Sequence, residues 1–190
     1  MQAVYRYLIA AVLAVVACQD AWSQRMVGGT FGLEAGAGMF SARQPLKDFS
    51  LNAALVAYTS KGNYQRYGLE YGHREHRYRG RPLSQETFML DAGYVLRLFG
   101  SGSRSFSINA GLSGAVGYES FNRGDKVLPD GALLLERDGL VYGVQVLMSL
   151  EFFVSDRIVL LLQGKALALW DTSQKQFRPS SGMGIRINLN

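Results

Sequence analysis

Bulky apolar residues alternate with small or polar residues through most of the chain, and the pattern repeats every two positions. In the C-terminal run, glycine, arginine and asparagine separate four apolar residues: Met183, Ile185, Ile187 and Leu189. Side chains two residues apart lie on the same face of a β-strand, whereas a helix brings residues three or four apart together. The alternation therefore predicts strands with one apolar face and one small or polar face.

Eight runs of the chain carry this alternation, and we expect each to form one strand. They span residues 31–40, 49–60, 64–76, 88–98, 106–119, 140–152, 157–170 and 183–189. The run at 157–170 is ambiguous, because its apolar segment could also belong to a buried helix. Gln163 and Lys165 are two residues apart and would lie on the same face of a strand, which favours a strand.

The connections between these runs alternate in length. Three are tight turns, at 61–63, 100–104 and 155–156, and four are longer, at 41–48, 77–84, 120–138 and 171–179. This predicts an all-β fold, an eight-stranded antiparallel up-and-down β-barrel whose two termini lie on the short-turn side. In barrels of the outer-membrane type, the short turns are periplasmic and the long loops face outward.

The face that points into the barrel decides between a membrane barrel and a soluble one. A soluble periplasmic barrel that binds an apolar ligand would turn its apolar residues inward, whereas an outer-membrane barrel turns them toward lipid. Here the positions between the bulky apolar residues hold small residues and a few charges, which suit a narrow interior. We expect an interior polar network of five acids and four bases: Glu34, Glu70, Arg74, Asp91, Arg97, Glu119, Glu151, Lys165 and Arg186. Its charges are nearly balanced, as burial requires.

Aromatic residues near the strand ends are candidates for the girdles that membrane proteins place at the lipid–water interface. These residues are Tyr58, Tyr67, Tyr71, Tyr94, Tyr118, Tyr142 and Trp170.

Composition narrows the remaining possibilities. The 190 residues correspond to about one domain, and an apolar fraction of 48% excludes a disordered chain. Charged residues make up only 18%, and one cysteine excludes a disulfide scaffold and a cysteine-cluster zinc site. A mean hydropathy of +0.02 argues against several membrane-spanning helices but is typical of strands that alternate apolar and polar residues.

The N-terminal residues have the features of an export signal. A positive charge precedes an apolar run at 8–17 that is too short to cross a bilayer as a helix. Small residues before Gln24 predict cleavage there. We therefore expect a signal peptide at 1–23 and a single barrel domain at 24–190. Lipid attachment to Cys18 is the alternative.

Candidate catalytic and metal-binding chemistry is sparse. His73 and His76 have a spacing that helical metal sites use, but residues three apart on a strand point to opposite faces. A lipid-modifying barrel enzyme would need a nucleophile beside a base, and His73 with Ser84 is the one candidate pairing. Nothing in their spacing supports it, so we expect no catalytic residue, no cofactor and no metal.

Two segments are candidate contact surfaces. A basic cluster, interrupted only by Glu75, suits anionic lipid headgroups or simple solvation better than nucleic acid; it comprises Arg74, Arg77, Arg79 and Arg81. The 120–138 loop contains an apolar patch among charges. Such patches often mark interaction sites, although packing within the loop explains this one equally well. The candidate partner contacts are Asp125, Lys126, Leu128, Asp130, Leu133 and Leu134.

Short motifs across nearly the whole chain match one known family in order and spacing. They include Gly32-Leu33-Glu34, Lys61-Gly62-Asn63, Gly68-Leu69-Glu70-Tyr71, Gly117-Tyr118-Glu119, Asp130-Gly131-Ala132 and Asp138-Gly139-Leu140. In these segments the chain resembles the TraO proteins of bacterial conjugative transposons. With the predicted barrel, the resemblance implies an outer-membrane component of the conjugal transfer machinery of a Gram-negative bacterium. It also implies other conjugation-machinery proteins as partners and carries no catalytic motif.

Shortening the 120–138 loop is expected to lower the frequency of conjugal transfer without harming membrane insertion, because the change removes partner contacts and leaves the strands intact. Mating assays and membrane fractionation measure the two effects separately. Unaltered mating would contradict the partner-contact hypothesis.

Overall fold

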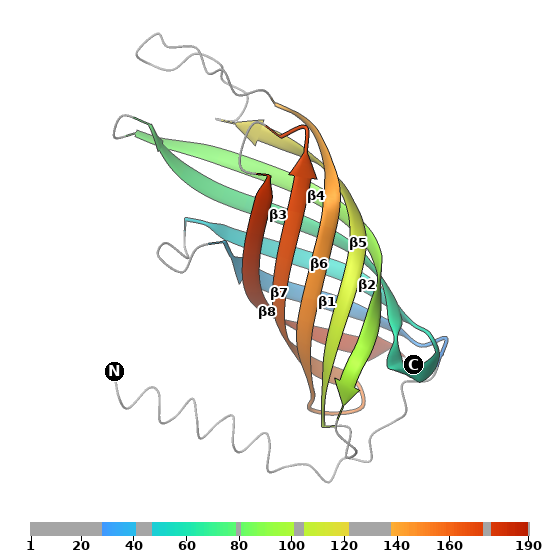
Figure 1. Cartoon of the computed structure of the whole chain (residues 1–190). Helices are drawn as coiled ribbons and strands as arrows, with labels where there is room; N and C mark the ends of the chain where they lie inside the picture. Colours follow the sequence, from blue (N-terminus) through green and yellow to red (C-terminus); the bar gives the residue numbers. More distant parts are fainter. Residues whose placement is uncertain are drawn as a thin grey trace, which may run out of the picture.

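The computed structural model describes residues 28–40, 47–78, 81–100, 105–121, 138–172 and 176–189. Within these ranges lie eight strands and a short 3-10 turn, η1 (Ser60–Gly62). The strands are β1 (Phe31–Met39), β2 (Phe49–Tyr58), β3 (Tyr64–Tyr78), β4 (Arg81–Gly100), β5 (Phe106–Phe121), β6 (Gly139–Phe153), β7 (Ile158–Trp170) and β8 (Phe177–Leu189). Each strand pairs with the next in sequence order, and β8 closes the barrel against β1 (Figure 1).

Antiparallel pairing throughout confirms the predicted eight-stranded up-and-down barrel. β1 and β8 are paired from Phe31↔Leu189 to Met39↔Ser181, so the first and last strands complete the wall. The ambiguous run at 157–170 forms strand β7, as its period-two pattern indicated. No helix in the described part of the chain is long and apolar enough to cross a membrane. We call the end of the barrel with the turns at 59–63 and 154–157 the turn end, and the opposite end the loop end.

The prediction of a loop at 77–84 is wrong. β3 continues to Tyr78 and β4 begins at Arg81, and the two strands stay paired as far as Tyr78↔Arg81. The segment is polar, but backbone hydrogen bonds between two antiparallel strands do not require an apolar face. The hairpin therefore continues past the point at which the apolar alternation fades.

The predicted loop at 171–179 extends too far, because β8 begins at Phe177. Pro179 lies within this strand, although proline lacks a backbone N–H and is rare in a central strand. It is paired with Ala166 of β7, whereas β1 ends at Met39, opposite Ser181. Among the described residues, β7 is therefore the only strand paired with this part of β8, and such edge positions tolerate proline.

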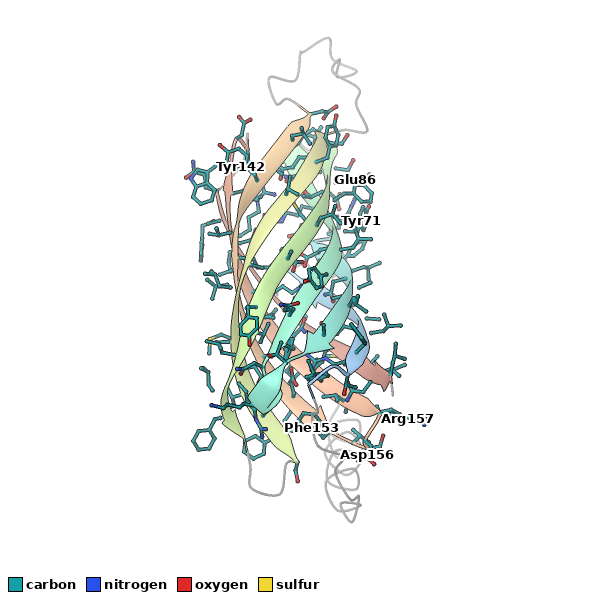
Figure 2. The ribbon with its side chains drawn as sticks, turned by 90° about the vertical axis from the view of Figure 1, so that its right-hand side faces the viewer. Tyr71, Glu86, Tyr142, Phe153, Asp156 and Arg157 are labelled. Atoms are coloured by element: carbon teal, nitrogen blue, oxygen red, sulfur yellow. The ribbon has the colours of Figure 1, made fainter. Side chains whose placement is uncertain are left out.

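The barrel wall is apolar outside and polar inside (Figure 2). Leu96 and Ile185 are 49% and 37% exposed although both are bulky and apolar, while Glu151 and Arg186 are completely buried. A barrel that is stable in water would show the reverse arrangement, since burying charge is costly and burying apolar surface is favourable. The outer surface is thus suited to an apolar solvent.

Aromatic side chains lie near both ends of this apolar wall. Toward the loop end, the Tyr142 and Trp170 rings stack with centroids 6.2 Å apart, and the Tyr71 and Phe88 rings lie 5.0 Å apart. Phe152 lies on the outer face of β6 near the turn end. The ten residue steps from Tyr142 to Phe152 correspond to roughly 25 Å of height for a strand tilted by about 40°. This is the usual height of the apolar band of outer-membrane barrels.

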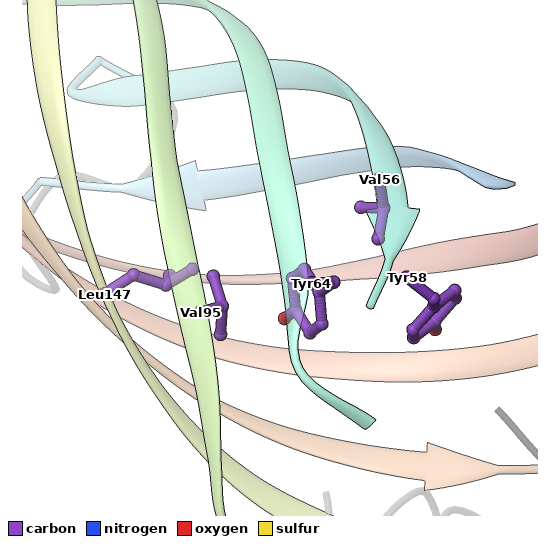
Figure 3. Close-up of a cluster of buried hydrophobic side chains, with 5 residues drawn as sticks. All are labelled: Val56, Tyr58, Tyr64, Val95 and Leu147. Atoms are coloured by element: carbon purple, nitrogen blue, oxygen red, sulfur yellow. The ribbon is translucent and has the colours of Figure 1, made fainter. Parts of the chain in front are cut away.

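Part of the interior is filled by two apolar clusters. Near the turn end, five side chains that are 4% exposed or less form the first cluster (Figure 3): Val56, Tyr58, Tyr64, Val95 and Leu147. The proposed interfacial position of Tyr58 is therefore wrong, because its side chain turns inward and approaches the Arg186 guanidinium. Nearer the loop end, the second cluster comprises Met89, Ala115, Val141 and Leu169.

Glycines allow β1 and β8 to approach closely where the barrel closes. Gly36 is paired with Gly184, and Gly38 with Gly182. A Cβ atom added at Gly182 would lie 2.5 Å from the carbonyl oxygen of Ala37 and 2.8 Å from the Cα atom of Gly38. Both are backbone atoms, so a side chain at position 182 would force the two strands apart.

We predict that Gly182→Ala lowers the temperature at which the folded barrel opens in detergent, because the added methyl group overlaps the backbone of β1. Overpacking of this kind costs about 1–3 kcal/mol. Gly164→Ala is the matched control, since Gly164 lies in the neighbouring strand and a Cβ atom there meets nothing within 4 Å. Heat-dependent gel mobility measures both variants, and equal opening temperatures would refute the prediction.

Candidate functional site

Arg186 lies at the centre of a buried polar network near the turn end. Its Nε and Nη2 groups donate to Glu34 Oε1 at 2.8 and 2.5 Å. Nη1 and Nη2 donate to Glu151 Oε2 and Oε1 at 3.0 and 2.8 Å, and Nη1 also donates to the Tyr58 hydroxyl at 2.7 Å. A guanidinium has five N–H groups. All five are therefore used, and none needs water.

The partners of Arg186 come from both sides of the barrel. Glu34 stands directly opposite Arg186 in the β1–β8 ladder, whereas Glu151 belongs to β6, which is paired with neither of these strands. Tyr64 of β3 donates its hydroxyl to Glu151 Oε1 at 2.8 Å, and its ring lies 4.4 Å below the Arg186 guanidinium. The network thus joins walls of the barrel that no backbone ladder connects.

Arg66 extends this network to β4. Its Nε donates to Glu34 Oε2 at 3.2 Å and its Nη1 donates to Asp91 Oδ2 at 2.5 Å. Arg66 is not among the nine residues predicted for the interior network. The alternation could have identified Arg66, since it lies at two-residue intervals from Gly68 and Glu70 and therefore on the same face of the strand.

Two further ion pairs lie nearer the loop end. Lys165 Nζ is 2.6 Å from Glu70 Oε2. Arg178 pairs with Glu119, which also accepts hydrogen bonds from Thr172 Oγ1 at 2.7 Å and from Gln85 Nε2 at 3.3 Å. Arg178 is also absent from the predicted network, because residues 171–179 were expected to form a loop, whereas β8 begins at Phe177.

The structure places seven of the nine predicted network residues in buried positions and leaves two at partly exposed ones. The buried seven are Glu34, Glu70, Asp91, Glu119, Glu151, Lys165 and Arg186. Arg74 lies at the loop end with its guanidinium 4.0 Å from the centre of the Phe40 ring, and Arg97 lies against Gly100 near the turn end. Arg66 and Arg178 occupy the buried basic positions instead, so the described interior still holds five acids and four bases.

The buried charged groups of the described interior pair with one another. Each buried carboxylate has a cationic partner within 3.2 Å or less. Among the described residues, no group of three or more His, Cys, Asp or Glu could hold a metal ion. The network therefore acts as a set of internal cross-links.

The other candidate residues lie elsewhere. His73 is paired with Glu86 while Ser84 is paired with Glu75, so the two are diagonal neighbours, and the His73 ring packs 5.4 Å from Phe49. The partner-loop candidates fall outside the described residues: Asp125, Lys126, Leu128, Asp130, Leu133 and Leu134. A hollow in the barrel wall is lined mainly by apolar residues such as Leu33, Leu69 and Leu90, and its lining also includes Glu34 and Asp91 of the interior network.

We predict that Arg186→Leu strongly destabilises the barrel, because it leaves Glu34 and Glu151 facing each other without their shared cation. Removing one partner of a buried pair costs about 3–5 kcal/mol. Arg186→Lys keeps the charge but only three donors, so a smaller loss is expected. Urea unfolding in detergent ranks the three proteins, and equal midpoints for wild type and Arg186→Leu would contradict the role of this cation.

Solved structures with the same fold are outer-membrane proteins with low sequence identity to this chain. Neisserial surface protein A is 16% identical, with a TM-score of 0.57 over 84% of this chain and 97% of that chain. The Yersinia pestis outer membrane protein Ail in a phospholipid bilayer nanodisc is 12% identical, with a TM-score of 0.51 over 85% and 99%. The N-terminal β-barrel domain of Pseudomonas aeruginosa OprF is 11% identical, with a TM-score of 0.50 over 85% and 98%. These similarities establish the fold alone.

A family match identifies the chain more closely than these folds do. No curated protein sequence matches it. The sequence profile described as conjugative transposon protein TraO, however, matches residues 27–189. This match begins before β1 and ends at the last residue of β8. Because it spans the whole barrel, we conclude that the chain belongs to the TraO family of conjugative transposon proteins.

Proposed function

We propose that this protein is an outer-membrane β-barrel component of the conjugal transfer machinery, with a structural or protein-interaction role. The observation that carries the proposal is the inverted wall, with bulky apolar side chains outside and paired charges inside. Family membership supplies the connection to conjugation. We expect export by the signal peptide at 1–23, insertion into the outer membrane of a Gram-negative bacterium, and other conjugation proteins as partners.

The dimensions of the wall support a membrane location. The apolar surface between Tyr142 and Phe152 has the height of the apolar band of outer-membrane barrels, and aromatic residues lie near both of its ends. β1 begins and β8 ends at the turn end, since Phe31 is paired with Leu189. In an outer-membrane barrel this end faces the periplasm, so the loop end would face outward.

The filled interior supports a role that depends on surfaces and not on transport. An eight-stranded barrel encloses room for side chains but not for an aqueous channel. Here Tyr58, Tyr64 and Arg186 are packed together across the lumen. The same charged interior argues against a soluble barrel that binds an apolar ligand, because apolar ligands prefer cavities lined by apolar side chains.

Fractionation of the producing cells tests the membrane location. The full-length protein is expected in the outer-membrane fraction, resistant to extraction without detergent, and with a gel mobility that changes on heating. Deleting its gene from the donor is expected to lower mating frequency, and restoring the gene recovers it. Extraction in buffer alone would refute the membrane location, while normal mating after deletion would refute the role in transfer.

A His73→Ala/Ser84→Ala double variant separates this proposal from the lipid-modifying enzyme. Neither residue belongs to the buried network, so the variant is expected to insert normally and to support wild-type transfer. A sharp fall in mating at normal protein levels would favour the enzyme.

A further inference from the structure

A β-bulge interrupts strand β4 close to the turn end of the barrel. The register of the β4–β5 ladder shifts between Arg97 and Phe99, which makes Leu98 an inserted residue. Phe99 is therefore paired with Ile108, whose side chain lies on the outer wall. In a regular ladder it would lie opposite Ser107, which is completely buried. The bulge thus turns Phe99 from the interior to the outer face, as bulges at barrel rims often do.

The inserted residue places two large apolar side chains next to each other on the outer wall. Leu98 is 58% exposed and Phe99 is 66% exposed. Neighbouring residues of a regular strand point to opposite faces, so the alternation alone would allow only one of them to project outward. Leu96, two residues earlier, is also exposed, and the pair therefore continues the apolar wall of β4 without a polar break.

Polar contacts hold the chain on both sides of the bulge. The backbone N–H of Arg97 donates to Asn63 Oδ1 at 2.9 Å, directly before the inserted residue. Directly after Phe99, Gly100 is paired with Ser107, and a Cβ atom added at Gly100 would overlap the Arg97 guanidinium. The bulge is therefore built into this part of the barrel, because the glycine leaves room for the arginine and the asparagine binds the backbone beside it.

Phe99 lies at the turn-end edge of the apolar band. Phe88 belongs to the aromatic residues near the loop end. It is paired with Tyr118 of β5, whereas Phe99 is paired with Ile108, ten residues closer to the turn end. Ten steps of a strand tilted by about 40° correspond to roughly 25 Å of height, which is the usual height of the apolar band. In the proposed orientation this edge meets the periplasmic leaflet of the outer membrane.

We propose that Leu98 and Phe99 anchor the turn end of the barrel in the periplasmic leaflet, with the Phe99 ring at the boundary between acyl chains and headgroups. A phospholipid is the partner that fits, because the pair is continuous with the apolar wall and aromatic residues of outer-membrane barrels gather at this boundary. The inference rests on the proposed membrane location, and it adds the leaflet and the residues that set the depth of the turn end.

Fluorescence quenching by brominated lipids measures the depth of a tryptophan in a bilayer. The chain contains two tryptophans, so the full-length protein first receives Trp22→Phe and Trp170→Phe. The test variant adds Phe99→Trp. The matched control adds Leu112→Trp, an exposed position of β5 about midway between Tyr118 and Ile108. Both proteins are placed in phosphatidylcholine vesicles that carry bromine either near the headgroup or near the end of the acyl chain.

In the Phe99→Trp protein, bromine near the headgroup is expected to quench about twofold or more strongly than bromine near the chain end, and the Leu112→Trp control is expected to show the opposite order. Heat-dependent gel mobility verifies that each barrel is folded. Leu98→Trp is the second variant, with the same expected order as Phe99→Trp, and it serves as the test if Phe99→Trp does not fold.

The control separates failure of this inference from failure of the membrane location. Quenching of the Leu112→Trp control by lipid, together with a Phe99→Trp protein that only a water-soluble quencher reaches, would overturn the anchor and favour a protein contact at the turn end. Stronger quenching of Phe99→Trp by bromine near the chain end would also overturn it. A Leu112→Trp control that neither lipid quenches would refute the membrane location itself.

Discussion

The buried charge of Arg186 is the constraint on which the rest of the barrel depends. A guanidinium removed from water needs a partner for every N–H group, and Glu34, Glu151 and Tyr58 together supply them all. Because Glu151 reaches the guanidinium from a strand that does not pair with β8, these contacts fix the shape of the barrel cross-section. The closed set of backbone ladders sets the circumference of the barrel, and the contacts across the lumen then restrict how far its cross-section can flatten.

Two kinds of residue, glycines and large polar or aromatic residues, make up much of the barrel interior. Glycines at the β1–β8 seam let the backbones meet, with Asn52 and Ser50 of β2 beside them. Elsewhere in the interior, charged and aromatic side chains such as Arg186 and Tyr64 fill the lumen. Apolar residues are then free to cover the outside. This division of roles explains a mean hydropathy near zero in a protein whose outer surface is apolar.

How far the sequence predicts the structure depends on which residues are considered. Gln163 and Lys165 correctly indicated a strand at 157–170, because alternation depends only on the geometry of the extended chain. The loop at 77–84 was wrong, because polarity says nothing about backbone pairing outside the membrane band. The interior network lacked Arg66 and Arg178 and contained Arg74 and Arg97, which are partly exposed. The two-residue alternation predicts the strand face on which a residue lies. Its position along the strand decides whether other side chains of the barrel interior bury it.

The sequence by itself determined that there are eight strands, their order and the face taken by most of the alternating side chains, because these follow from the two-residue period and from the length of the connections. It did not determine the strand ends at 77–84 and 171–179 or the inward position of Tyr58. Only the tertiary structure decided which charges meet. Glu151 and Arg186 are separated by 35 residues and by two strand-to-strand steps, yet their atoms lie 2.8 Å apart. That contact depends on the register of every ladder between them and on the closure of the barrel. Both are properties of the whole assembled sheet, which no local pattern encodes.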